Sequence, residues 1–176
     1  NHSWRFGFNT IYHDITPGEV IDKVTSVATG LGLQNRYAWE NALFAADEWK
    51  IASWLNISMG LRFTTFSVLG QGDFYVLDGD SDIVDTLSYE SGEIAKTYFN
   101  SEPRFSASFL LTDEISIKAS YNRNAQYLHL ISNNSAGNPS DKWIPSNNNI
   151  RPEIADQISL GYFQNFHDNT FEFSAD

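Results

Sequence analysis

Apolar and polar side chains alternate along several stretches of this chain, most clearly between Glu102 and Arg123. Two alternating arms flank a short polar segment at Thr112-Asp113. The apolar positions are Phe105, Ala107, Phe109 and Leu111 in the first arm and Ile115, Ile117, Ala119 and Tyr121 in the second. Because successive side chains of a strand point to opposite faces of the sheet, this pattern predicts a β-hairpin with one apolar and one polar face.

The same period of two predicts strands elsewhere. They cover Ser3 to His13, Leu55 to Thr64 and Glu153 to Gln164, and a last strand begins at Thr170. Residues 36–51 alternate poorly, but their aromatic content also favours a strand. With the central hairpin, the pattern predicts an all-β, antiparallel fold of about seven strands.

The predicted connections alternate between long and short. The long ones cover residues 14–35, with a short helix expected around Glu19 to Val27, and residues 67–97 and 131–151. The short ones lie at residues 52–53, 112–113 and 166–169. Long loops are uncommon in compact soluble domains, whereas outer-membrane barrels have short periplasmic turns and long outer loops. We therefore predict a segment of a transmembrane β-barrel, with the three short turns on the periplasmic side.

A membrane setting explains the two faces of the strands. Lipid offers no hydrogen bonds, so a spanning sheet pairs its backbone internally, turns its apolar face to lipid and keeps its lumen polar. In the hairpin, Phe105 and Ile117 would then face lipid, while Arg104 and Lys118 would line the lumen. Aromatic residues near predicted strand ends suit interfacial girdles; they are Trp4, Tyr12, Trp54, Phe66, Tyr98, Tyr121, Tyr127 and Tyr162. A soluble antiparallel sandwich or barrel also gives one apolar and one polar face, so alternation by itself leaves that alternative open.

Composition narrows the choice of partners. The 176 residues suffice for one domain, and the net charge of −11 argues against a nucleic-acid partner, because phosphate contacts need clustered Lys and Arg. The chain has no cysteine, which excludes disulfides and thiolate sites. It begins at Asn1 without Met and stops within an alternating run, so we expect a partial sequence.

An acidic segment is the main candidate for metal chemistry. Asp78, Asp80 and Asp82 alternate in the way that favours oxygen ligation of Ca²⁺. The EF-hand pattern is absent, because Ile83 stands where that loop needs Gly and Tyr89 stands where it needs Glu. These three aspartates are therefore a calcium candidate through another loop geometry, and the alternative is a solvated acidic loop.

No enzymatic motif emerges from the sequence. The four histidines are scattered, and no nucleophile elbow, phosphate-binding loop or dinucleotide fingerprint is present, so we predict no enzyme and no catalytic residues. Tyr75, Tyr89 and Trp143 lie in predicted long loops, where aromatic rings could stack on sugars or flat chelates. They are the candidates for ligand contact, with local loop packing as the alternative.

Several short stretches together resemble the TonB-dependent receptors of the Gram-negative outer membrane, particularly those of Bacteroidetes. They are Gly60-Leu61-Arg62-Phe63, Glu102-Pro103-Arg104, Lys118-Ala119-Ser120-Tyr121-Asn122-Arg123, Gln126-Tyr127-Leu128-His129-Leu130, Asp141-Lys142-Trp143-Ile144-Pro145, Ile150-Arg151-Pro152, Ala155-Asp156-Gln157 and Gly161-Tyr162-Phe163. Their order is similar to the middle-to-late barrel of that family.

The resemblance implies a barrel of about 22 strands with a plug domain in its lumen. Residues 1–176 would then be a partial barrel domain that lacks the plug and the barrel ends. The resemblance further implies TonB-driven uptake of a scarce, bulky nutrient such as an iron chelate, cobalamin or a glycan. Expected partners are outer-membrane lipid, the plug, the TonB complex and a surface lipoprotein.

Two other functions fit the same pattern. One is a complete small outer-membrane barrel of about eight strands, acting as an anchor or adhesin. The other is a secreted β-sandwich that binds carbohydrate and folds in water without detergent.

Overall fold

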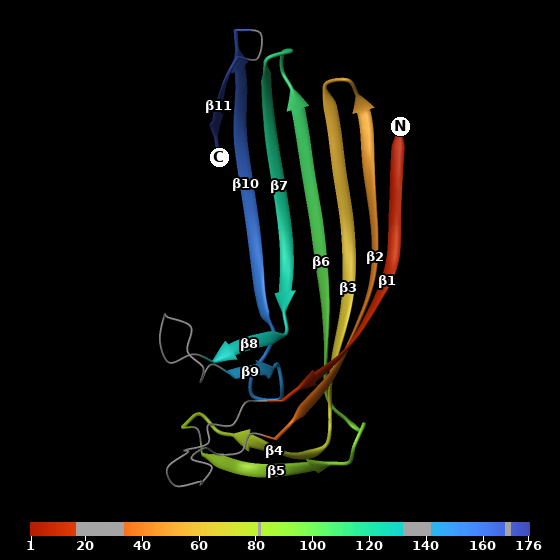
Figure 1. Cartoon of the computed structure of the whole chain (residues 1–176), viewed down its shortest axis with the longest axis vertical. Helices are drawn as coiled ribbons and strands as arrows, with labels where there is room; N and C mark the ends of the chain where they lie inside the picture. The colour runs from red at the N-terminus through yellow and green to blue at the C-terminus, as the bar shows by residue number, and fades with distance from the viewer. Residues whose placement is uncertain (17–33, 81, 132–141, 168–169) are drawn as a thin grey trace, which may run out of the picture.

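Seven antiparallel strands form one open sheet in the order β1-β2-β3-β6-β7-β10-β11 (Figure 1). The computed structural model describes residues 1–16, 34–80, 82–131, 142–167 and 170–176. The strands are β1 (His2–Ile15), β2 (Arg36–Ala52), β3 (Leu55–Leu69), β6 (Ile94–Leu110), β7 (Ile115–Gln126), β10 (Glu153–Phe166) and β11 (Phe171–Ala175). The predicted all-β antiparallel architecture is confirmed. Within the described ranges, no helix is long and apolar enough to cross a membrane.

The sequence predicted simple loops at the long connections. Two of these connections instead contain hairpins of their own. Residues 67–97 contain the pair β4 (Gly72–Leu77) and β5 (Ile83–Tyr89). At the connection predicted for 131–151, β8 (Leu128–Ile131) pairs with β9 (Lys142–Pro145). In addition, β3 continues to Leu69 and β6 begins at Ile94, because the two strands go on pairing beyond the predicted boundaries. The helix expected at 19–27 lies outside the described residues.

The register places the apolar positions of neighbouring strands on one face. Phe8 is opposite Leu43, and Leu43 is opposite Phe63, which extends the pattern across β1, β2 and β3. Side chains on this face are strongly exposed, including Phe6 at 85% and Ile158 at 82%. Apolar side chains in such number on an open face indicate contact with lipid or another apolar partner. We call this surface the outer face.

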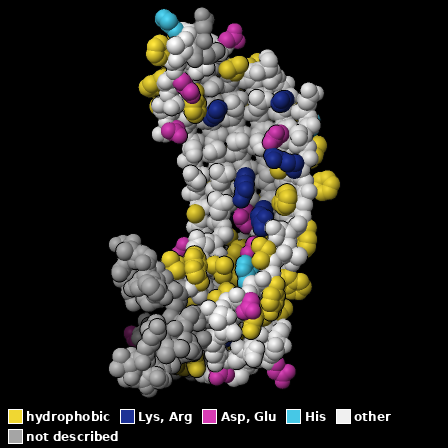
Figure 2. Space-filling model, viewed as in Figure 1, with side chains coloured by type: hydrophobic (Ala, Val, Ile, Leu, Met, Phe, Trp, Pro, Cys, Tyr) yellow, Lys and Arg dark blue, Asp and Glu magenta, His cyan; other side chains and the backbone are white. Residues whose placement is uncertain are grey.

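The opposite, polar face is lined by small hydroxyl side chains and cations. A row of four serines crosses four adjacent strands through direct cross-strand pairs; they are Ser58, Ser106, Ser120 and Ser159. A hollow of about 490 Å³ lies over this row and is also lined by Lys118 and Glu48. Figure 2 shows Lys and Arg side chains on the middle and upper part of this face, with a few Asp and Glu side chains among them. We call this surface the inner face.

Contacts with β1 explain why the sequence of β2 alternates poorly. Phe44 lies on the inner face opposite Gly7, and a Cβ atom at Gly7 would come within 2.6 Å of the Phe44 ring. Asp47 lies among apolar side chains of the outer face, where its Oδ2 is 2.7 Å from Nδ1 of His2. Gly7 therefore makes room for Phe44, and His2 is a partner for one of the two carboxylate oxygens of Asp47.

Candidate functional site

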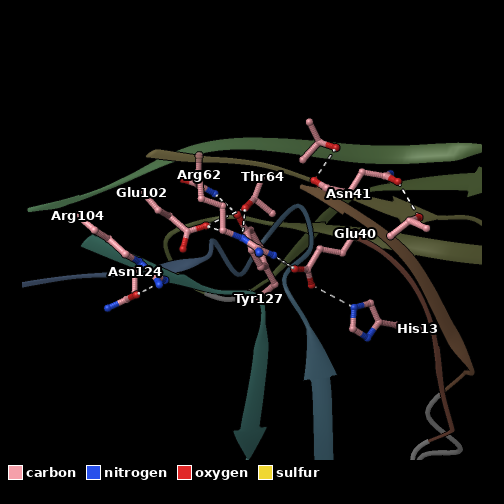
Figure 3. A network of polar contacts seen from close by, with 12 residues as sticks. His13, Glu40, Asn41, Arg62, Thr64, Glu102, Arg104, Asn124 and Tyr127 are labelled. Carbon is pink, nitrogen blue, oxygen red and sulfur yellow. Dashed lines mark hydrogen bonds and ion pairs between the residues drawn. The ribbon is translucent and has the colours of Figure 1, made fainter. Parts of the chain in front are cut away.

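A network of charged side chains lies on the inner face, near the end of the sheet that carries the long connections. Its centre is Arg62 of β3, which lies between Glu40 of β2 and Glu102 of β6 (Figure 3). Arg62 Nη2 donates to Glu40 Oε1 at 3.4 Å, and Arg62 Nε is 3.8 Å from Glu102 Oε1. Arg62 and Glu102 are direct cross-strand partners, so the register itself brings these opposite charges together.

The network continues on both sides of Arg62. Thr64 Oγ1 donates to Glu102 Oε1 at 2.7 Å, and both residues are buried, at 1% and 5% exposure. On the other side, His13 Nε2 is 3.2 Å from Glu40 Oε2. The cluster thus combines two carboxylates with one guanidinium and one imidazole. Because buried carboxylates are costly without partners, these contacts stabilise the charges on the sheet.

Tyr127 connects this network to the polypeptide that leaves the sheet after β7. Its ring stacks on Phe66 of β3, with centroids 4.7 Å apart and planes inclined by 8°. Its hydroxyl oxygen accepts a hydrogen bond from Asn100 Nδ2 at 2.8 Å. Phe66 and Tyr127 belong to a small apolar core with Ala38, Val68 and Phe74. The start of this connection is therefore held against the inner face.

Residues 146–150 link the connection that contains β4 and β5 to the connection that contains β8 and β9. Ser146 N donates to Tyr127 O at 2.7 Å, and Tyr98 Oη donates to Asn147 O. The side-chain amides of Asn148 and Asn149 both donate to Tyr75 O, at 2.8 and 2.7 Å. The segment after β9 is thus tied to the sheet, to Tyr127 and to β4.

The three aromatic candidates for ligand contact have different surroundings. Tyr75 on β4 and Trp143 on β9 are exposed, at 45% and 53%, on two separate hairpins. Tyr89 on β5 is partly buried and meets Phe74 edge to face, with ring centroids 5.3 Å apart. Exposure leaves Tyr75 and Trp143 available to a ligand, while the ring of Tyr89 packs within its own hairpin.

The aspartates predicted to bind calcium lie in the turn between β4 and β5. Asp78 Oδ1 accepts hydrogen bonds from the backbone N–H groups of Asp80 and Asp82, each at 2.9 Å. In the part of the chain that the structure describes, no group of three or more His, Cys, Asp or Glu residues is arranged to hold a metal ion. Calcium binding here stays a prediction, and the observed hydrogen bonds stabilise the turn.

The charged network was not predicted from the sequence, although Arg62 and Glu102 both lie in the family-like motifs. A signal was nevertheless present, since Arg62 and Thr64 occupy polar positions of an alternating strand. Glu40 and Tyr127 were harder to identify as members of the network. Glu40 lies in the poorly alternating β2, and Tyr127 lies beyond the end of β7.

Replacing Tyr127 with Phe should loosen the connections without unfolding the sheet. The change removes the acceptor for Asn100 Nδ2 at a buried position, so we expect a loss of about 1 kcal/mol in local stability. Hydrogen exchange of residues 128–131 and 142–150 would measure this loss. Tyr12→Phe is a matched control, because Tyr12 is 61% exposed on the outer face.

The same variant has a pH signature. Burial raises the pKa of the Tyr127 hydroxyl above its ordinary value of 10.0. Since the folded state favours the neutral phenol, its stabilising effect should be complete below pH 10 and should fall as pH rises through the folded-state pKa. Tyr127→Phe should lack this alkaline loss of protection. An identical alkaline loss in both proteins would show that Tyr127 does not hold the connection.

Comparison with protein families gives one result over the whole chain. Residues 1–176 match the family described as TonB dependent receptor-like, beta-barrel. Searches among curated proteins and among solved structures gave no match. The family match agrees with the antiparallel sheet and its two contrasting faces.

Proposed function

Because this chain belongs to the family of TonB-dependent receptor-like β-barrels, we propose that it forms wall and outer connections of a Bacteroidetes-type outer-membrane transporter. The family consists of receptors and transporters, not of enzymes. In general its members work with a plug domain and with TonB. Beyond family membership, we infer that the protein lies in the outer membrane, that its long connections face the outside of the cell, and that its cargo is a scarce, bulky nutrient.

The contrast between the two faces carries this proposal. On β2, Trp39 and Trp49 share the outer face and are separated by ten positions in the sequence. That separation corresponds to about 33 Å along a strand. For a strand tilted by about 40°, it spans about 25 Å across the bilayer, which matches the apolar band of outer-membrane barrels. The neighbouring strand adds Tyr12 opposite Trp39 and Trp4 close to Trp49, which suits two aromatic girdles.

The inner face suits the lumen of a larger barrel. Seven strands form an open sheet here, so residues 1–176 would supply part of a wall of about 22 strands. The serine row and the cations Arg104 and Lys118 would then face the plug or the path of the cargo. Hydroxyl groups keep such a wall hydrated without closing the passage with bulky side chains.

The connections carrying β4, β5, β8 and β9 would lie outside the cell and contact the cargo. Tyr75 and Trp143 offer exposed rings there, which could stack on a flat iron chelate, cobalamin or a glycan. A surface lipoprotein would find its docking surface at the same end. The opposite, short turns would be periplasmic.

Growth of a deletion strain tests this function. The strain should fail to grow when one cargo class is limiting and supplied only as the bulky form, and the full-length gene should restore growth. Complementation with Trp143→Ala should weaken uptake at low cargo concentration, whereas Trp54→Ala, at a turn on the opposite end, should not. Both variants are first checked for equal amounts in the outer membrane.

A different result would identify another class of protein. If the intact protein is a folded monomer in water without detergent, the membrane function is wrong and a soluble carbohydrate-binding module becomes the better explanation. Unimpaired growth on every cargo would argue against a transporter and leave an anchor or adhesin.

A further inference from the structure

The β4–β5 hairpin has two outer edges, and their surroundings differ. The side chain of Asn149 lies at the outer edge of β4 and forms hydrogen bonds with its backbone, as a short strand would. Its Nδ2 donates to Tyr75 O at 2.7 Å, and its Oδ1 accepts from Leu77 N at 3.4 Å. Asn148 adds a second donor to the same carbonyl. The edge of β4 is therefore already paired.

Among the residues that the structure describes, the outer edge of β5 has no paired strand. Tyr75 and Asp73 lie opposite Thr86 and Ser88. The carbonyl of Tyr75 points away from β5, so the backbone groups of its partner Thr86 also point away from the hairpin. This direction repeats every two residues, so the backbone groups of Ser88 point the same way as those of Thr86. Thr86 N donates to the neighbouring side chain of Asp85 at 2.8 Å, which is a local contact. Among described residues, no other strand pairs with this edge.

The side chains of β5 are also open to solvent. Every residue from Ile83 to Ser88 is exposed, and Ile83 and Val84 are each 60% exposed. An exposed edge strand with apolar side chains is a template for pairing with another chain. Proteins usually protect such an edge unless a partner uses it.

The charge of the hairpin selects among partners. Residues 70–93 contain seven Asp and Glu residues and neither Lys nor Arg. A second copy of this chain would bring the same negative charge to the edge and would be repelled. A basic segment would be attracted, with its alternate apolar side chains covering Ile83 and Val84.

We propose that the outer edge of β5 binds an extended, basic segment of a partner protein, which adds to the hairpin as a third strand. The backbone groups of Thr86 and Ser88 supply the hydrogen bonds, and the surrounding carboxylates, with Asp85 nearest, select basic side chains. This partner site is separate from the cargo function proposed above and does not depend on which nutrient is transported.

A short synthetic peptide of alternating Lys and Val residues is a direct probe. It should bind the full-length receptor in detergent saturably, as measured by fluorescence anisotropy after subtraction of empty micelles. The same peptide methylated at every amide nitrogen keeps its charge but cannot donate backbone hydrogen bonds, so its affinity should fall by about tenfold or more. A Glu–Val peptide should not bind, and added salt should weaken the Lys–Val complex.

Receptor variants locate the site. Asp85→Asn should weaken the Lys–Val peptide by about two- to fivefold, because it removes one exposed charge but keeps an acceptor for Thr86 N. Asp113→Asn, at a short turn on the opposite end, should leave binding unchanged. The proposal is overturned if the Lys–Val peptide does not bind, if the methylated or Glu–Val peptide binds equally well, or if the two variants behave alike.

Discussion

Arg at position 158 should prevent assembly in the outer membrane, whereas Arg at position 157 should be tolerated. Ile158 lies in the middle of β10 on the outer face, opposite Tyr121, and is 82% exposed. A charged side chain on the lipid face costs up to about 2–4 kcal/mol at the middle of the bilayer and less towards the interface, where Tyr121 and the ion pair of Arg123 and Asp156 lie. Membrane fractionation and heat-dependent gel migration of Ile158→Arg would measure the defect.

Gln157→Arg is the matched control for this experiment. Gln157 is the adjacent residue of β10, is also exposed, and lies on the inner face opposite Asn122. In a soluble protein, both substitutions would be surface changes with effects within about 0.5 kcal/mol. Equal tolerance at the two positions would therefore contradict the lipid-facing assignment.

Replacing Arg62 with Met should destabilise the wall by about 2–3 kcal/mol, since it leaves Glu40 and Glu102 without their shared cation. The estimate lies below that for a fully buried pair because the Arg62 side chain is 26% exposed. Urea unfolding of the full-length protein in lipid vesicles, followed by tryptophan fluorescence, would measure the change.

Two further variants separate loss of charge from loss of packing. Arg104→Met removes an exposed cation of the same face, whose Nη2 donates to Asn124 Oδ1 at 3.2 Å, and should change stability little. Adding Glu102→Gln to Arg62→Met should recover part of the lost stability, because one unpaired carboxylate is then neutral. If the double variant is no more stable than Arg62→Met, the charges of the network are not what stabilises the wall.

Alternation along β3, β6, β7 and β10 was enough to predict their faces. The positions of Phe105, Ile117 and Lys118 followed from the sequence alone, because the two-residue period of a strand is a local property. The faces of β2 could not be predicted in this way, since Phe44 and Asp47 lie on faces that suit them only through Gly7 and His2 of β1. No window along β2 contains those two partners.

The connections show the same division between local and distant information. Glycine and acidic residues correctly indicated a break in the wall after β3, but the β4–β5 pairing was not predicted. That hairpin depends on Phe74, which packs into a core with Phe66 and Tyr127, and on Asn149, which pairs the edge of β4. These residues come from separate parts of the chain.

The sequence by itself determined an all-β chain with an apolar and a polar face, since side-chain direction repeats within each strand. Its short motifs also indicated the receptor family that the match over residues 1–176 shows. Only the tertiary structure decided which charges meet around Arg62 and that the edge of β5 has no paired strand among the described residues. Those features depend on strand register and on contacts between distant segments, and a residue's position along the chain does not specify either one.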